Sequence, residues 1–338
     1  MKEKLLYIIL VIILMLFFIE YTLKQLGYTA YKRSFENLEV TPSFYIGHDS
    51  LLGFGLKSGD FNMTLNDTFT CKYTINKLQN RITSFQDLNF DKKIIIMGCS
   101  FTFGDLLNDD QTHPFKLQTY LIRDSIKVVN LGVSGYGPTQ FLLQLKQIKN
   151  DDNSIKALII NYASFQDGRT TLTRSWRYWI EPSSSKHNLN KKVMMPYVEL
   201  KNNSLLVSAK QLTYKLRPLQ DKLAFVQLID NIFNIKENNT ATQITEKVFY
   251  AIAELCKNKN IPLLVAALSK DDKTIQMINK LKAKGIKTIN YNIDLNKPDY
   301  NFQPIDWHPN EKANTIFADS IIKKLNKMNI VKLKQIII

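Results

Sequence analysis

Two widely separated segments of the chain carry the residue types that covalent acyl chemistry needs. Ser100 directly follows the apolar run "KKIIIMGC", and "DWHPN" places Asp306 and His308 on either side of one tryptophan. A serine hydroxyl is a weak nucleophile until a base takes its proton, and an acid beside that base fixes its tautomer. These residues predict a serine–histidine–aspartate site, provided that the fold brings them together.

Alternating strand and helix patterns surround these segments. Apolar runs predict five strands, at residues 92–98, 127–132, 155–162, 261–268 and 286–292, with helical spacing between them. Strands that alternate with helices predict an α/β fold with a parallel sheet and helices on both faces. The carboxyl ends of parallel strands meet at one edge, so Ser100, the loop "NLGVSGYGP", the segment "NYASFQDGR" and the acid–histidine pair are expected on one rim.

In this order the motifs resemble the SGNH, or GDSL-type, hydrolase family over roughly residues 91–328. Residues 46–85 also resemble the leader region of its membrane-anchored bacterial members. The resemblance implies a three-layer α/β/α sandwich with a five-stranded, flavodoxin-like parallel sheet. It implies that Ser100 is the nucleophile, that His308 is the base and Asp306 its partner, and that the backbone N–H groups of Ser100 and Gly135 belong to the oxyanion hole.

Three positions depart from the family pattern. Cys99 stands where the first motif usually has aspartate. Gln166 occupies the place of the asparagine that completes the oxyanion hole; its amide has the same donor on a longer arm, and Asn161 is a rival. Only Trp307 separates Asp306 from His308, where two residues are usual, so we expect an altered turn there.

Other classes of site fit less well. An α/β-hydrolase elbow needs Gly-x-Ser-x-Gly, and Thr102 stands at the second glycine; the loop "GVSGYG" also lacks the Gly-x-Gly-x-x-Gly spacing of a dinucleotide fold. The histidines are isolated and the cysteines form neither metal-type spacing nor an even disulfide set, so we expect no metal and no other cofactor. These residues are Cys71, Cys99, Cys256, His48, His113, His187 and His308.

The N-terminus predicts a membrane attachment. "MKEK" precedes the apolar residues 5–19, and no small-residue cleavage site follows. We expect an uncleaved signal anchor over 1–26, against a cleaved signal peptide as the competitor. Lys2 and Lys4 favour a cytoplasmic N-terminus, which places the catalytic domain outside the cytoplasm as a single-pass protein of a bacterial inner membrane. A β-rich extension is expected over 27–89, and the hydrolase domain over 90–338 with an insertion or lid at about 169–240.

The substrate prediction rests on aromatic and basic residues. Flat aromatic faces suit sugar rings and arginines suit anionic groups, although packing under a lid explains the aromatics equally well. The candidate substrate-binding residues are Arg169, Trp176, Trp179 and Trp307. The net charge of +15 fits phosphate, anionic lipid or acidic glycan, and the lysine-rich C-terminal segment fits either a solvated helix face or lipid headgroups.

These features together predict a membrane-anchored serine esterase. Its expected substrate is an acylated glycan, namely O-acetyl groups on a cell-envelope or exported polysaccharide. The alternatives are an acyltransferase that uses the same serine, and a catalytically silent glycan-binding subunit. Expected partners are the membrane, through the N-terminal helix, and other envelope polysaccharide-modifying proteins, with no nucleic acid.

Overall fold

The computed structural model describes residues 2–32, 38–150, 152–186 and 193–331. The helices are α1 (Lys2–Gln25), α2 (Ser100–Phe103), α3 (His113–Leu121), α4 (Pro138–Gln147), α5 (Asp167–Thr170), α6 (Arg174–Lys186), α7 (Ala224–Asn258), α8 (Asp272–Ala283) and α9 (Glu311–Lys327). The described residues also form four 3₁₀ turns, at Asp109–Gln111, Ile122–Asp124, Ser164–Gln166 and Pro298–Tyr300.

Five parallel strands form the central sheet, in the order β12-β11-β8-β6-β7. They are β6 (Lys92–Met97), β7 (Ile126–Asn130), β8 (Ile155–Tyr162), β11 (Leu263–Ala267) and β12 (Lys287–Asn290). In chain order this is the 2-1-3-4-5 arrangement of a flavodoxin-like sheet, so the strand order reverses at β6 and β8. The predicted α/β class and five-stranded parallel sheet are confirmed.

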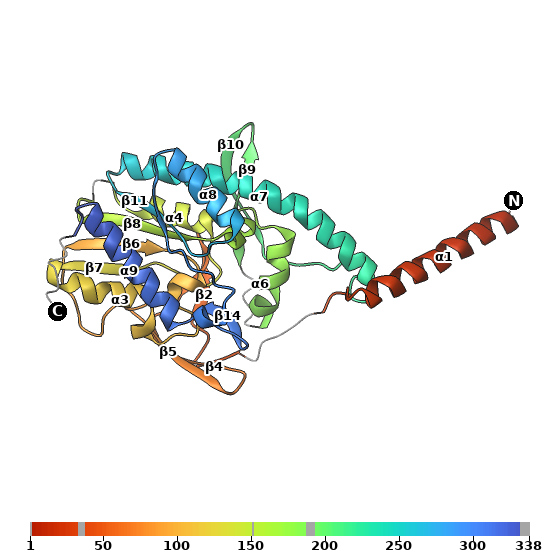
Figure 1. The fold of residues 1–338 in the computed structure, drawn as a ribbon, viewed down its shortest axis with the longest axis horizontal. Coiled ribbons are helices and arrows are strands. Elements are labelled where there is room, and N and C mark those ends of the chain that lie inside the picture. The colour runs from red at the N-terminus through yellow and green to blue at the C-terminus, as the bar shows by residue number, and fades with distance from the viewer. Residues whose placement is uncertain (1, 33–37, 151, 187–192, 332–338) are drawn as a thin grey trace.

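Helices cover both faces of this sheet (Figure 1). Alternate residues of β8 point to opposite sides, because side chains alternate along a strand. Leu158 and Ile160 join the core under α4, α7 and α8, whereas Ala157 and Ile159 join the core under α3 and α9. The near-continuous apolar strands of the sequence are therefore buried on both sides, which gives the three predicted layers.

The predicted insertion at 169–240 is largely regular structure. It contains α5, α6, the hairpin of β9 (Met194–Lys201) and β10 (Ser204–Gln211), and the first half of α7. Asn202 and Asn203 have φ of 49° and 65°, as a two-residue hairpin turn requires. The long helix α7 begins inside the predicted insertion, at Ala224. In its first turns Asp230 is buried while Ile232, Phe233 and Ile235 are exposed, the reverse of the burial that an amphipathic pattern predicts.

The β-rich extension packs against the main domain as part of one core. Its strands are β1 (Leu38–Thr41), β2 (Ile46–Asp49), β3 (Gly53–Leu56), β4 (Gly59–Leu65) and β5 (Phe69–Ile75). Bridges from Ile75 to Arg81 and from Arg81 to Asn130 connect it with the edge strand β7. Two further short strands, β13 (Asn301–Phe302) and β14 (Asp306–Pro309), pair ahead of α9.

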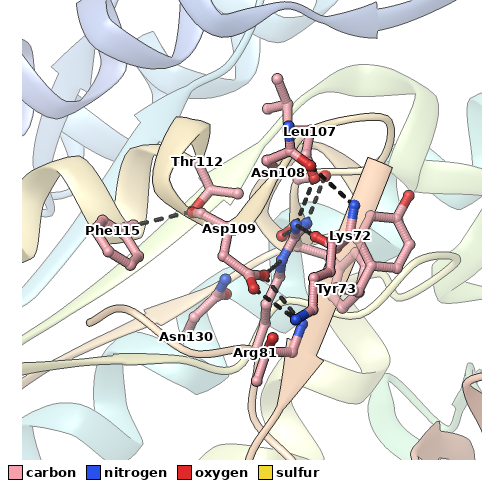
Figure 2. A network of polar contacts seen from close by, with 12 residues as sticks. Lys72, Tyr73, Arg81, Leu107, Asn108, Asp109, Thr112, Phe115 and Asn130 are labelled. Atoms are coloured by element: carbon pink, nitrogen blue, oxygen red, sulfur yellow. Dashed lines mark hydrogen bonds and ion pairs between the residues drawn. The ribbon is translucent and has the colours of Figure 1, made fainter. Parts of the chain in front are cut away.

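A buried arginine fixes the extension to the loop that follows α2. Figure 2 shows the Arg81 side chain surrounded by this loop. Its Nε donates to Asp109 Oδ1 at 2.8 Å, and its terminal nitrogens donate to the carbonyl oxygens of Phe103, Gly104, Leu107 and Lys72. Its guanidinium carbon lies 4.4 Å from the centre of the Tyr73 ring. This network holds the segment after the candidate nucleophile in one conformation.

Within the described residues, α1 is the one helix long and apolar enough to cross a bilayer, a property that it shares with signal sequences. It extends away from the sheet, and its C-terminal end meets the start of α7 (Figure 1). There the Glu20 carboxylate accepts hydrogen bonds from the N–H groups of Ala224 and Phe225, at 2.9 and 3.0 Å. Lys24 pairs with Glu20 at 3.1 Å.

Candidate active site

Ser100 lies at the first position of α2, just beyond the carboxyl end of β6. The helix is a single turn, and Gly104 ends it with φ of 91°. A side chain at Gly104 would meet the Cγ2 of Thr112 at 2.4 Å, so only glycine fits both the backbone angle and the space. The turn brings the Asp105 N–H to the Ser100 carbonyl at 3.0 Å. Ser100 and Asp105 thus lie side by side.

The acid–histidine pair forms in spite of its short spacing. One oxygen of Asp306 lies 2.5 Å from His308 Nδ1 and 2.6 Å from the His308 backbone nitrogen. Because Asp306 and His308 point to the same side of the short strand β14, one intervening residue is enough. Trp307 points the other way and is 62% exposed.

A second carboxylate faces the other ring nitrogen of His308. Asp105 Oδ2 lies 3.7 Å from His308 Nε2, and Ser134 Oγ donates to Asp105 at 2.8 Å. Burial alone would lower the pKa of His308, but its hydrogen bond and charge contact with Asp306, and the charge of Asp105, raise it to about 9. Burial raises the pKa of Asp105 above its usual range. At neutral pH the resting imidazole therefore carries a proton.

Ser100 and His308 open into one cavity of about 420 Å³ at the point where the strand order of the sheet reverses. The predicted residues Gly135, Arg169, Trp176 and Trp179 also line it, while Trp307 does not. Within the described chain the Ser100 hydroxyl makes no hydrogen bond, so it is available to a ligand in the cavity. The remaining lining residues are Leu38, Phe44, Tyr45, Ile46, Phe54, Phe101, Asp105, Ser134, Phe165 and Ile180.

Two backbone donors stand at the cavity without an acceptor among the described residues. The Ser100 N–H is one of the first N–H groups of α2, which a helix leaves unpaired. The Gly135 N–H belongs to a residue with φ of 90°, and a side chain at Gly135 would come within 3.0 Å of the Phe54 ring. This glycine allows the loop after β7 to approach the serine closely.

The structure does not bring the two predicted amide donors to the cavity. Gln166 is fully buried, and its Nε2 donates to Cys99 Sγ at 3.1 Å and to the Asn161 carbonyl at 3.4 Å. Asn161 Nδ2 contacts Thr102 Oγ1 and the ring of His113. Both amides therefore support the loops behind the site, and neither side chain faces the ligand space.

Comparison with known proteins gives fold-level similarity only. No family model and no curated protein matches the chain. Among solved structures it is similar to a GDSL-like lipase from Bacteroides thetaiotaomicron, with 16% identity, 73% of this chain and 94% of the other covered, and a TM-score of 0.38. It is also similar to the esterase EstA from Pseudoalteromonas, with 11% identity, 70% of this chain and 98% of the other covered, and a TM-score of 0.40. A third similar structure is an acetylxylan esterase from Geobacillus stearothermophilus, with 10% identity, 71% of this chain and 96% of the other covered, and a TM-score of 0.36.

Sequence reasoning missed Asp105 and the contribution of the extension. Asp105 comes one residue after the glycine that ends the turn, and that helix-ending signal was available in "GCSFTFGD". Tyr45, just before β2, and Phe54, in β3, reach the cavity from the extension, whose packing no local pattern shows. Two arginines that follow Arg169 in the sequence have structural contacts instead: Arg174 pairs with Asp230 at 2.7 Å, and Arg177 donates to backbone carbonyls.

Within the described ranges no group of three His, Cys, Asp or Glu side chains is placed to hold a metal ion. The groups that face the cavity are instead a hydroxyl, an imidazole with its carboxylates, two free N–H groups and one guanidinium. This set is suited to attack on an acyl carbon and to stabilisation of the resulting negative charge.

Proposed function

We propose that the protein is a membrane-anchored serine ester hydrolase of the SGNH type. The observation that carries the proposal is the meeting of Ser100, the Asp306–His308 pair and the unpaired N–H groups of Ser100 and Gly135 at one cavity. These residues come from segments more than 200 positions apart in the chain. A serine after a strand alone has ordinary structural explanations, but this convergence supplies a nucleophile, a base and oxyanion donors together.

The chemistry follows from this arrangement. Neutral His308 takes the proton of Ser100 through Nε2 while the oxygen of Ser100 bonds to the ester carbonyl carbon. The carbonyl electron pair moves onto its oxygen, where the N–H groups stabilise it. The C–O bond to the alcohol then breaks, and His308 returns its proton to the leaving oxygen. Water repeats the sequence on the acyl-serine, and Asp306 orients the ring through Nδ1 throughout.

The proposed substrate is an ester-linked acyl group, with O-acetyl on an envelope or exported polysaccharide as the expected case. The cavity wall supports this, because Trp176 and Trp179 present aromatic surface beside Ser100. Trp179 is 68% exposed, so its face is available to a sugar ring. The apolar helix α1 supports a place at the membrane, and the lysines at its N-terminus favour a catalytic domain outside the cytoplasm.

An ester hydrolysis assay tests the proposal. The full chain in detergent should release acetate from a neutral activated acetyl ester, and Ser100→Ala and His308→Ala should each lose that activity. The loss expected for a missing nucleophile or base is on the order of 10⁴-fold or more in kcat. Thr119→Ala, an exposed hydroxyl on α3, is the matched control and should equal wild type.

Equal activity of wild type and Ser100→Ala would refute the proposal and favour a glycan-binding role. Adding an acylated and an acyl-free polysaccharide to the same assay separates the remaining possibility. Acetyl transfer to the glycan in excess of release to water would identify an acyltransferase that uses the same serine.

A further inference from the structure

The cavity contains one arginine that the proposed mechanism has not used. Arg169 follows β8 through the short helix α5, and it is the one lysine or arginine among the described residues that line the Ser100 cavity. Only 8% of its surface is exposed. The side chain thus places a guanidinium at the cavity wall from a buried position.

The partners of Arg169 place it beside both backbone oxyanion donors. One terminal nitrogen donates to the Tyr136 carbonyl at 2.7 Å, and the guanidinium also interacts with the Cys99 thiol. Tyr136 follows Gly135 and Cys99 precedes Ser100, so the guanidinium contacts the immediate neighbours of the two free N–H groups. A tetrahedral oxyanion held by those N–H groups would lie within the same corner of the cavity.

The orientation of the guanidinium is fixed by packing. Its central carbon lies 4.4 Å from the centre of the Trp176 ring and 5.0 Å from that of Phe165. The Nε–H is buried and has no hydrogen-bond acceptor among the described residues. A buried polar donor without a partner is costly, so a ligand that accepts from this arginine is favoured.

Arg169 is also without a salt bridge among the described residues. Within the described chain no carboxylate forms an ion pair with it, since Asp105 contacts Ser134 and His308 instead. Burial lowers the pKa of Arg169, as expected for a cation away from water. An oxygen that gains negative charge is therefore favoured beside Arg169.

We infer that Arg169 supplies the third oxyanion donor of the Ser100 site, in place of the amide that Gln166 cannot present. The inference rests on the proposed serine esterase function. It makes Arg169 a catalytic residue whose interaction strengthens as negative charge develops on the carbonyl oxygen. The competing role for this arginine is recognition of an anionic group on the substrate.

A neutral substrate separates the two roles. We expect Arg169→Met in the full chain to lower kcat for a neutral activated acetyl ester by about 10²–10³-fold with little change in KM. Arg169→Lys should keep part of the activity, and guanidinium ion added to Arg169→Gly should restore it saturably. Gln166→Met should lose less kcat than Arg169→Met, and Arg123→Met, an exposed arginine on another part of the molecule, is the matched control.

Several outcomes would overturn the inference. Activity of Arg169→Met within about threefold of wild type on the neutral ester would reduce the arginine to substrate recognition or packing. A loss of activity that is restored neither in Arg169→Lys nor by guanidinium added to Arg169→Gly would assign Arg169 a structural role. A larger loss in Gln166→Met would return the donor role to the amide. If wild type and Ser100→Ala show equal esterase activity, the proposed function and this inference both fail. If wild type is active and Ser100→Ala is not, the Arg169 variants test the inference alone.

Discussion

At the scale of single residues, the distinctive feature is one histidine held between two carboxylates. Asp306 binds Nδ1, as a base partner should, while Asp105 lies near Nε2, the nitrogen that must accept the proton of Ser100. Both charges stabilise the imidazolium, and the pKa of His308 is therefore raised to about 9 despite its burial. A protonated His308 cannot act as a base, so activity should rise with pH up to this value.

Asp105→Asn should extend activity to lower pH. The neutral amide removes one of the negative charges that stabilise the imidazolium, so the pKa of His308 falls and its base form persists at lower pH. We expect the acid limb of kcat/KM to move down by on the order of one pH unit. Ser134→Ala keeps the Asp105 charge and is the control, with its limb near the wild-type position. Superimposable profiles for wild type and Asp105→Asn would show that Asp105 does not influence the base.

The sequence could predict Ser100, Asp306, His308 and Gly135 as members of one rim, because each follows or precedes a strong strand or helix pattern. It also predicted Arg169 as a substrate-binding residue, but it could not predict that the Gln166 amide, three residues earlier, turns inward away from the cavity. That difference depends on the 3₁₀ turn and the helix α5 between them, whose few residues carry no periodicity.

At the scale of elements, the site depends on the contacts that the β-rich extension makes with the loop after α2. Arg81 is wholly buried with Asp109, and its terminal nitrogens donate to the carbonyl oxygens of Phe103, Gly104 and Leu107 (Figure 2). Removing one partner of a buried ion pair leaves the other charge uncompensated, which costs more than the pair contributes. The extension is thus a structural part of the catalytic unit.

Arg81→Leu should lower the free energy of unfolding by about 3–5 kcal/mol, because Asp109 is left buried without a cation. Denaturant unfolding of the full chain, followed by tryptophan fluorescence, measures the change. Arg81→Leu combined with Asp109→Leu should recover part of the loss. Lys72→Met is the control, because both side chains of the Lys72–Asp60 ion pair are exposed. Its free energy of unfolding is expected to change by no more than about 0.5 kcal/mol. An unfolding midpoint of Arg81→Leu equal to that of wild type would contradict the proposed stabilising role of Arg81.

The regular elements of the sheet were predictable because buried parallel strands and amphipathic helices leave strong patterns. The first half of α7 was not, although Gln227, Asp230, Asn231 and Asn234 in "AFVQLIDNIFNI" recur at helical spacing. The structure shows why: Ala224 and Asp230 are buried, whereas Ile232, Phe233 and Ile235 remain exposed on the same helix. This half of α7 packs against α1 and α6, which are distant in sequence.

At the scale of the whole molecule, the N-terminal helix is joined to the catalytic domain by a specific contact. The Glu20 carboxylate caps the first N–H groups of α7, which begins 204 residues later in the chain. A helix N-terminus carries partial positive charge and unpaired donors, and a carboxylate satisfies both. This contact fixes the C-terminal end of α1 to the start of α7.

Glu20→Gln should loosen the start of α7 without unfolding the protein. The amide keeps one acceptor but loses the charge and the second oxygen, at a cost of about 1 kcal/mol. Hydrogen–deuterium exchange on the full chain in a bilayer mimetic should then show about fivefold faster exchange in the first turn of α7, with the sheet unchanged. Glu3→Gln, at the other end of α1, is the matched control. Unaltered exchange in α7 would argue against the cap.

With α1 in a bilayer, the cap at Glu20 leaves almost no slack between the lipid surface and the catalytic opening. Trp179 lines both the Ser100 cavity and a second cavity between residues 27–32 and α7. The Ser100 cavity is therefore adjacent to the region where α1 meets α7. The enzyme would therefore work at a set height above the leaflet. Under the proposed function, ester groups at that height would be hydrolysed, whereas identical esters farther from the membrane would remain beyond its reach.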